Sequence, residues 1–393
     1  MRSAKTLPSV LSLQTTGSST STESTSTSPS TSNRRLFLKR GMVAGAAAAV
    51  GTGILARGAP AFAAEVDSSP ISKGDAAILS FLAAAELVES DLWQQYSELG
   101  GLTPGQLPVE TAPFKPMNSY QAAFMNLDPD GPQYITSNAN DEISHAEFLN
   151  AYLILKGFEP VNLDAFRTLP SSQAEGAQQI GRLTNLMDLT IDTSWYTRYR
   201  SAKNPDFGAK FPQAIDLVRV TGIPRNNADF EPRKHVQAIA NTAAFHFGTI
   251  EQGGSTLYSA MAQKATNGEV LQIVVSIGGD EVAHFLEWVD FSGNGVQPPV
   301  APFSDPISGL TFPNFDATVD PSLQTNLIFP VPCEFISASL PRCAVIRPTN
   351  PSGIAMGVVN FLIHMGLFIG QPQAFLQTLR SLAEAADEAQ RGL

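Results

Sequence analysis

Cysteine, histidine and basic residues are scarce in this sequence of 393 residues. It contains 2 cysteines, 5 histidines, and 25 lysines and arginines against 36 acidic residues. Cys333 and Cys343 have no histidine or second cysteine pair beside them, which argues against a cysteine metal site. In an oxidising compartment we expect these two residues to form one disulfide that closes a small loop.

A long apolar run is also lacking, and the short run near the start belongs to a predicted leader over residues 1–63. Residues 14–33 are almost entirely Ser and Thr, a composition that cannot bury a core. An arginine pair at 34–35 precedes Leu-Phe-Leu-Lys and an apolar stretch over 42–56. The leader ends at 61–63, Ala-Phe-Ala, which has the small-x-small pattern of a cleavage site.

The arginine pair and the residues after it resemble a twin-arginine export signal. The alternatives are an ordinary secretory signal and a membrane anchor, but the apolar stretch is short against the roughly 20 residues of a spanning helix. The twin-arginine machinery passes folded proteins, often with a cofactor loaded, so we expect export to the periplasm or exterior. The Ser/Thr-rich start also permits a plastid transit peptide ahead of a lumen signal.

Without the leader the charge is strongly one-sided. The remaining chain has 18 basic and 35 acidic residues, a net charge of −17 with histidine neutral. Such a surface disfavours nucleic acid and anionic membranes as partners, and it is compatible with collecting cations. Most of these acids are expected to be ordinary solvated surface.

Four segments after the leader have the apolar periodicity of long amphipathic helices. They cover residues 74–99, 119–156, 233–264 and 268–291. The second contains a turn signal, Asp-Pro-Asp-Gly-Pro at 128–132, where an interruption is expected.

The rest of the chain has weaker patterns. The connection over 157–232 contains one further helical segment, about 174–201, between Pro-rich loops. The composition of residues 296–351 predicts an irregular, partly extended segment around the rest of the fold. Two helices, about 352–369 and 372–390, are expected to close the chain.

Two of the long helices carry the same short motif, Asp-Glu-x-x-His. The glutamates and histidines of the two copies are Glu142 with His145 and Glu281 with His284. Positions i and i+3 are neighbours on one face of a helix, so each copy offers a carboxylate and an imidazole to the same point. A two-metal carboxylate site takes its ligands from two helices of a bundle with this spacing.

A solvated helix face is the alternative interpretation of these acids. Against it, Glu281 shares an apolar stripe with Ile277 and Trp288, and Glu142 shares one with Leu149. Bare charges on an apolar face are unfavourable to bury, and a bound divalent cation is the natural compensation.

A site of this kind needs one further glutamate from each of the other two helices. In the third helix Glu251 is the only acid, and Gly253-Gly254 beside it indicate close helix approach or a local bulge, since a helical Gly costs about 1 kcal/mol against Ala. In the first helix Glu86 and Glu89 both qualify. The three alanines before Glu86 favour it, which leaves Glu89 as a bridging alternative or a supporting acid.

The order of these residues along four successive helices resembles the ferritin-like superfamily. The segments around 85–89 and 280–284 are similar to its exported bacterial branch, which is related to plant desiccation-associated proteins. The resemblance implies an all-α fold, with a ferritin-like four-helix bundle over 64–295 and a long crossover insertion over 157–232. An irregular and helical extension would follow over 296–393.

The resemblance also implies a centre of two iron ions, or manganese or a mixed pair, that reacts with dioxygen or peroxide. The glutamates of the two motifs would bridge or chelate, each motif histidine would bind one metal, and the other two glutamates would be terminal ligands. The implied ligands are Glu86, Glu142, His145, Glu251, Glu281 and His284.

Three aromatic residues lie within a turn or two of these ligands. Trp93, Tyr96 and Tyr258 could be oxidised or relay electrons, and the alternative is plain core packing. Among the other histidines, His246 precedes Glu251 by five positions and should point off the ligand face. We expect His235, near a helix start, to be exposed, and we expect His364 to be a core residue.

The pattern leaves three functions open and identifies no substrate. The leading hypothesis is a metal-dependent oxidase that acts on ferrous iron or on a small organic molecule. The second is a non-catalytic, metal-binding stress or desiccation-related envelope protein. An iron-storage cage is disfavoured, because the insertion and the C-terminal extension would obstruct shell packing, so we expect a monomer or dimer.

Overall fold

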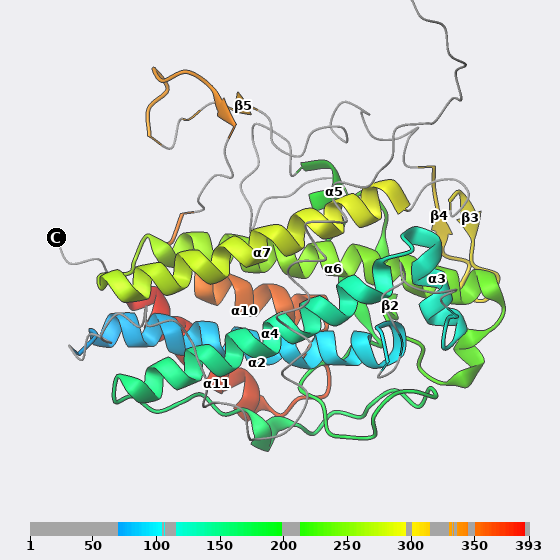
Figure 1. The fold of residues 1–393 in the computed structure, drawn as a ribbon, viewed down its shortest axis with the longest axis horizontal. Helices are drawn as coiled ribbons and strands as arrows, with labels where there is room; N and C mark the ends of the chain where they lie inside the picture. Colours follow the sequence, from blue (N-terminus) through cyan, green and yellow to red (C-terminus); the bar gives the residue numbers. More distant parts are fainter. Residues whose placement is uncertain are drawn as a thin grey trace, which may run out of the picture. The chain divides into compact units, whose positions relative to one another are not determined.

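The computed structural model describes residues 70–103, 106, 115–198, 213–295, 301–314, 330–331, 333, 336–344 and 350–389. The predicted leader, residues 1–63, lies outside the described residues. Within them the chain is mostly helical, with three small two-stranded sheets (Figure 1).

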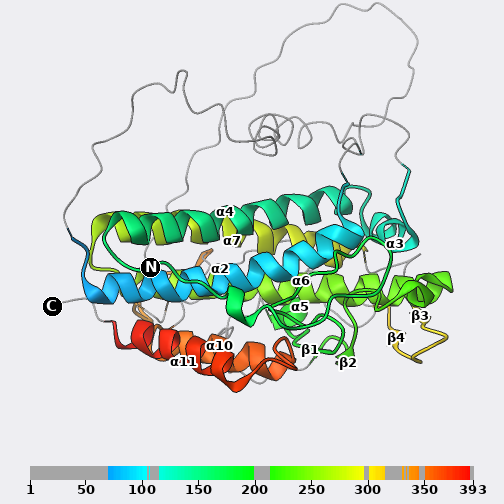
Figure 2. The same cartoon turned by 90° about the horizontal axis from the view of Figure 1, so that it is seen from below.

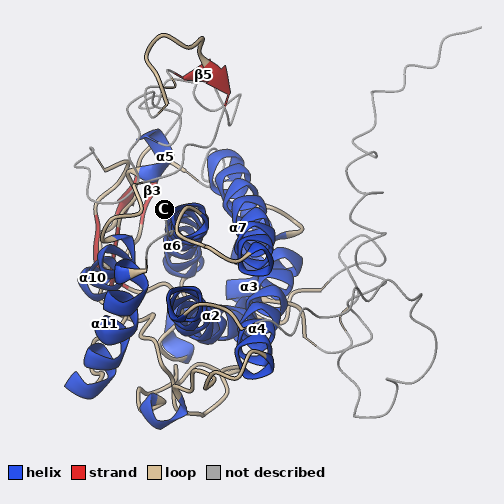
Figure 3. Cartoon of the chain, turned by 90° about the vertical axis from the view of Figure 1, so that its left-hand side faces the viewer, coloured by secondary structure: helices blue, strands red, loops and turns tan. Residues whose placement is uncertain are grey.

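Four long helices form a bundle: α2 (Lys73–Gly100), α4 (Gly131–Leu155), α6 (Arg233–Ala262) and α7 (Gly268–Gly295). Helix α2 packs along α4, and α6 packs along α7. Seen end-on in Figure 3, the four helices surround a common interior. A continuous apolar core, with Trp93, Phe247 and Trp288 fully buried, fills this interior. The predicted all-α four-helix bundle is confirmed.

A cap fixes the start of α2 and ties it to the turn before α7. The Ser72 side chain accepts a hydrogen bond from the backbone N of Asp75 at 3.0 Å, which satisfies one of the donors that a helix start leaves open. The Asp75 carboxylate in turn accepts from the backbone N of Thr266 at 2.8 Å. Burial raises the pKa of Asp75, but the hydrogen bonds from Thr266 and Ser72 outweigh burial and hold it below its ordinary value.

The turn signal at 128–132 separates two helices, α3 (Ser119–Leu127) and α4. Asn118 caps α3 by accepting from the backbone N of Gln121 at 2.8 Å. Helix α4 has Pro132 in its first turn, where the N–H that proline lacks is not needed. The interruption therefore lets α3 turn away and pack mainly on α6.

The described residues of the connection between α4 and α6, 156–198 and 213–232, are mostly extended and irregular rather than helical. It contains η2 (Asp164–Phe166), β1 (Leu189–Ile191), α5 (Trp195–Arg198), β2 (Leu217–Val220) and η3 (Asn227–Phe230), with β1 antiparallel to β2.

Over its described residues, 174–198, the predicted helix over 174–201 is therefore wrong apart from the short α5, and residues 199–201 lie outside the described residues. Buried Asp91 of α2 holds this segment in place by accepting from the Thr184 backbone N at 2.9 Å and from its hydroxyl at 2.7 Å. β-Branched residues such as Thr190 and Ile191 further favour the extended backbone.

The two helices of the C-terminal region cover one side of the bundle (Figure 2). The described strands of this region, β3 (Phe303–Ser304) with β4 (Thr311–Phe312) and β5 (Pro330–Val331) with β6 (Cys343–Ala344), form two hairpin-like pairs. Helices α10 (Ile354–Met365) and α11 (Gln373–Glu388) follow. They lie along the α2 and α6 side, away from α4 and α7 (Figure 2).

Cys333 is buried and Cys343, in β6, is exposed, and the disulfide between them stays a prediction. Among the described helices, none has the length and apolarity required to cross a membrane.

Candidate metal centre

The bundle brings all six predicted ligand residues into one buried cluster. The four glutamates are at most 1 % exposed, and the two histidines are 8 % and 4 % exposed. Two groups made up of these six residues alone have ligand atoms within 4.8 Å of one another: Glu86, Glu142, His145 and Glu281 form one, and Glu142, Glu251 and His284 form the other. Glu142 belongs to both groups, as a residue between two cations must.

The inner nitrogen of each histidine faces the carboxylates. His145 Nδ1 lies 3.4 Å from Glu86 Oε2 and 3.3 Å from Glu142 Oε2. His284 Nδ1 lies 3.1 Å from Glu142 Oε1 and 3.3 Å from Glu251 Oε2. The cluster therefore has two ends, one with Glu86 and His145 and the other with Glu251 and His284.

The outer nitrogen of each histidine faces an aspartate of the opposite motif. His145 Nε2 lies 3.2 Å from Asp280 Oδ2, and His284 Nε2 lies 3.4 Å from Asp141 Oδ2. The hydrogen bond from His145 holds the pKa of Asp280 below its ordinary value. When the imidazole is neutral, an aspartate at Nε2 favours the proton there, and the Nδ1 lone pair would then be directed into the cluster.

The role of Asp141 and Asp280 was not predicted from the sequence. The available signal was the aspartate shared by both motif copies. On its own helix each aspartate immediately precedes a ligand candidate, and only the approach of α4 to α7 places it against the other histidine.

The cluster contains seven buried nitrogen and oxygen atoms that no hydrogen bond satisfies. They are Glu86 Oε2, Glu89 Oε2, Glu142 Oε1, Glu251 Oε2, both carboxylate oxygens of Glu281, and His284 Nδ1. An unsatisfied buried polar group costs about 1–3 kcal/mol, and more when it is charged. These atoms are all metal-ligand types and converge on one region, so the residues present fit a metal centre.

The shifted pKa values of the cluster show that it holds an excess of buried carboxylates. Burial, and then repulsion from Glu86, raise the pKa of Glu142 to about 8. Burial and the charges of Glu142 and Glu89 raise the pKa of Glu281 well above its ordinary value. Burial lowers the pKa of His145, but hydrogen bonds to Asp280 and the glutamates outweigh burial and raise it to about 12. Positive charge is favoured at this site.

Gly254 makes room for the Glu281 carboxylate. A Cβ on Gly254 would overlap Glu281 Oε2 and lie 2.8 Å from Glu281 Cδ. Nearby on α7, a Cβ on Gly278 would lie 2.7 Å from Tyr258 Cβ. The glycines thus allow α6 and α7 to approach closely at the cluster, which is one of the two explanations that the sequence suggested for Gly253-Gly254.

Both glutamates of α2 reach the cluster, at different places. Glu86 is grouped with His145, whereas Glu89 is grouped with Glu142, Glu251 and Glu281. The Glu89 side chain is partly exposed, but its Oε2 atom is buried and unsatisfied. The geometry thus places Glu86 at the end of the cluster beside His145, and Glu89 beside the glutamates between the two ends.

Two of the three predicted aromatic residues contact ligand candidates directly. The Trp93 Nε1–H donates to Glu251 Oε1 at 2.8 Å, and the Tyr258 hydroxyl donates to Glu86 Oε1. Tyr96 instead bonds His246.

Two expectations about the other histidines are wrong. His235 is 4 % exposed, because Asp305 from the β3–β4 turn and Asp229 of η3 enclose it, with Asp305 Oδ2 at 2.9 Å. His364 is exposed, since it lies on the outer face of α10.

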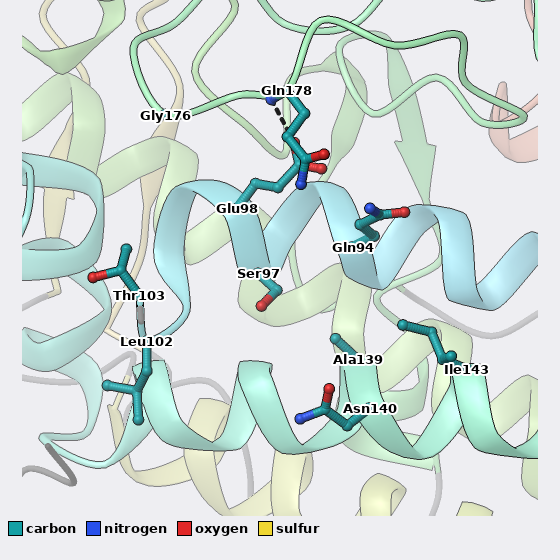
Figure 4. A pocket seen from close by; sticks show the side chains of 10 residues that line it. All are labelled: Gln94, Ser97, Glu98, Leu102, Thr103, Ala139, Asn140, Ile143, Gly176 and Gln178. Atoms are coloured by element: carbon teal, nitrogen blue, oxygen red, sulfur yellow. Dashed lines mark hydrogen bonds between the residues drawn. The ribbon is translucent and has the colours of Figure 1, made fainter. Parts of the chain in front are cut away.

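A pocket of about 300 Å³ lies outside the cluster, where α2 and α4 meet the loop at Gly176 and Gln178 (Figure 4). Polar residues such as Gln94 and Asn140 line it together with apolar ones such as Ile143. None of the six predicted ligands lines it.

Comparison with known proteins gave one family match. A model described as a ferritin-like domain matches residues 74–288, which include α2, α4 and α6, most of α7 and the whole candidate centre. No curated protein and no solved structure gave a significant match.

Proposed function

Because the chain belongs to the ferritin-like family, we propose that the cluster binds two iron ions and that the protein is an oxidase reacting with dioxygen or peroxide. Manganese or a mixed pair is the alternative occupancy. The observation that carries the proposal is the convergence of seven unsatisfied buried ligand atoms. The two histidines, Trp93 and Tyr258 satisfy part of the buried acids, and the seven atoms remain without a hydrogen bond.

The two ends of the cluster assign the ligands. Glu86 and His145 would hold one cation, and Glu251 and His284 the other. Glu142, which faces both histidines, would bridge. Glu281 lies in the first group, with its Oε1 at 3.8 Å from His145 Nδ1, and both of its oxygens are available to bridge or chelate.

The bound ions would supply the redox electrons, and the chain's own residues would control their surroundings. Tyr258 restrains Glu86 and Trp93 restrains Glu251, so each end glutamate keeps one oxygen fixed and one oxygen for the cation. Asp280 and Asp141 orient the imidazoles from outside. Burial keeps bulk water from the cluster, which strengthens each of these electrostatic contacts.

Export belongs to the same proposal. A protein delivered folded through the twin-arginine machinery to the periplasm or exterior could carry its metal with it. N-terminal sequencing of the mature protein should place the new start just after residue 63. Replacing Arg34 and Arg35 by lysine should retain the precursor inside the cell, and unimpaired export of that variant would contradict the assignment.

Metal content is the direct test of the centre. Protein purified from its native compartment should contain two irons, or two manganese ions, per chain by elemental analysis. The Glu142→Ala variant should lose them, whereas Glu147→Ala, an exposed glutamate on the same helix, should keep them. Equal metal content in both variants would refute the assignment.

Oxygen consumption separates catalysis from mere binding. The metal-loaded protein should take up dioxygen with ferrous iron, and Glu281→Ala and His284→Ala should abolish that uptake. If metal raises the melting temperature but no oxygen is consumed, the protein is the non-catalytic stress or desiccation-related envelope protein. Helices α10 and α11, which cover one side of the bundle, favour a monomer or dimer over a cage in either case.

A further inference from the structure

The pocket between α2 and α4 has one wall that contacts within the chain hold in place. Gly176 has φ 104°, a backbone that only glycine adopts readily, and a Cβ there would lie 3.4 Å from the Glu98 carbonyl oxygen. Glu98 Oε2 accepts from the Gln178 backbone N at 2.9 Å and from Arg182 Nη2 at 2.5 Å. Figure 4 shows the contact of Glu98 with Gln178. This wall is therefore formed before any ligand binds.

The pocket combines a buried floor with an open rim. Ala139 on α4 is 4 % exposed and the Glu98 side chain on α2 is 6 % exposed, whereas Asn140 and Ile143 are exposed. A molecule in the solvent can therefore reach the floor. The volume of about 300 Å³ is at the lower end of the roughly 300–1,000 Å³ of small-molecule sites, which suits a compact ligand such as one sugar ring.

The chain leaves hydrogen-bonding groups of this pocket unpaired. The side chains of Gln94, Ser97, Asn140 and Gln178 have no hydrogen-bond partner among the described residues. Each amide offers two donors and an acceptor, and the hydroxyl both donates and accepts. Glu98 Oε1 is also buried without a donor. A ligand with several donors and acceptors would satisfy these groups together.

The charges at the pocket disfavour an ion as the ligand. Among the described residues that line the pocket, Glu98 is the only charged one, and Arg182, whose side chain is 1 % exposed, neutralises it. An anion would meet one carboxylate and no cation, and a cation would meet a carboxylate that is already paired. A wholly apolar ligand would cover the amides without replacing their hydrogen bonds to water. The best ligand is therefore neutral and polar.

We propose that this pocket binds a neutral polyhydroxy compound of one ring, a sugar or a cyclic polyol. The hydroxyls around such a ring both donate and accept, which matches the amides of Gln94, Asn140 and Gln178. Its C–H faces would pack on Ile143 and Leu102, which also line the pocket. None of the six ligand candidates of the metal centre lines the pocket, so binding requires no metal.

Amide NMR signals of the unaltered, metal-free protein give the first test. The titrants are D-glucose, D-galactose, D-mannose and myo-inositol, and the ones that bind tell a sugar site from a polyol site. At least one should bind with a dissociation constant on the order of 1 mM, as expected of a small ligand. The side-chain amide signals of Gln94 and Asn140 should shift, whereas that of Gln272, an exposed residue of α7, should not.

Variants then locate the site. Gln94→Leu and Asn140→Leu each remove one hydrogen-bonding side chain that has no partner within the described chain, so neither breaks an internal contact. Each should weaken binding about 2–10-fold, the effect of losing one hydrogen bond. Gln272→Leu removes an exposed amide outside the pocket and is the matched control, which should bind as the parent does.

Three results would overturn the proposal. One is that none of the four compounds binds at concentrations up to about 100 mM, far above the affinity expected here. Another is that Gln272→Leu weakens binding as much as Gln94→Leu does. The third is that choline or acetate shifts the pocket signals at lower concentration than the polyhydroxy compounds do.

The metal content of the same samples separates this inference from the proposed function. Gln94→Leu should retain the metal content of the parent protein while its affinity for the ring compound falls. If the parent protein binds no metal, the proposed function fails, and the titration of the metal-free protein still decides whether the pocket binds its ligand.

Discussion

Replacing Gly254 by alanine tests how tightly the helix backbone is matched to the candidate centre. In an ordinary helix, Gly→Ala stabilises the protein by about 1 kcal/mol. Here the new Cβ would occupy the place of Glu281 Oε2 and lie 2.8 Å from its Cδ. The Glu281 carboxylate must therefore move away from the position in which it faces His145 and Glu142.

A shift of this kind should weaken metal binding rather than unfold the bundle. Displacing a ligand through its surroundings typically lowers metal affinity about 10–100-fold. At 1.4 kcal/mol for each factor of ten, this corresponds to a loss of about 1.4–2.8 kcal/mol of metal-linked stability. Gly279→Ala is the matched control, since Gly279 lies on α7, two residues before Glu281, and has no atom within 4 Å of its new Cβ.

Calorimetric titration of the metal-free variants with manganese(II), alongside thermal unfolding with and without metal, measures both effects. Gly279→Ala should bind metal as the parent does and gain about 1 kcal/mol of stability. Gly254→Ala should bind it about 10–100-fold more weakly, with a smaller rise in melting temperature on adding metal. Equal affinities in the two variants would show that Glu281 is not a ligand or that its position is not set by Gly254.

Three further predictions concern pH, orientation and folding. The pKa of Glu142 is raised to about 8 from an ordinary 4.5, so its contribution to metal-free stability is full below about pH 4.5 and is lost as the pH rises through about 8. The melting temperature of the metal-free protein should therefore fall between these two pH values. A melting temperature that does not change with pH would contradict the argument that burial raises this pKa. Asp280→Asn should lower metal affinity about 10–100-fold without changing the circular dichroism spectrum, because His145 loses the carboxylate that orients it. Ser72→Ala should reduce the free energy of unfolding by about 1 kcal/mol through loss of the cap on the Asp75 backbone N, while metal titration stays unchanged.

Local sequence patterns were sufficient to predict several features of this protein. Helical spacing places Glu142 beside His145 and Glu281 beside His284 whatever surrounds them, because i and i+3 always share a face. The turn signal at 128–132 likewise acts through its own proline and glycine. For these features the physical cause lies within a few residues of chain, so the sequence was sufficient for the bundle helices and for the residue types of the candidate centre.

The wrong predictions concern segments whose structure depends on contacts with residues that are distant in the sequence. The segment 174–194 is not helical, because buried Asp91, some 90 positions earlier, binds Thr184. His235 is enclosed by Asp305 from a hairpin 70 positions later. A local propensity of a few tenths of a kcal/mol per residue is easily outweighed by such buried hydrogen bonds.

Only the tertiary structure decided how the centre is assembled. It alone pairs the histidine of each motif with the aspartate of the other, separates the position of Glu86 from that of Glu89, and brings Met365 against His246. Each of these contacts joins residues that lie more than a hundred positions apart or depends on where a neighbouring helix comes closest. The spacing of residues along one helix specifies the chemical groups, but their distances to partners on other helices follow from packing.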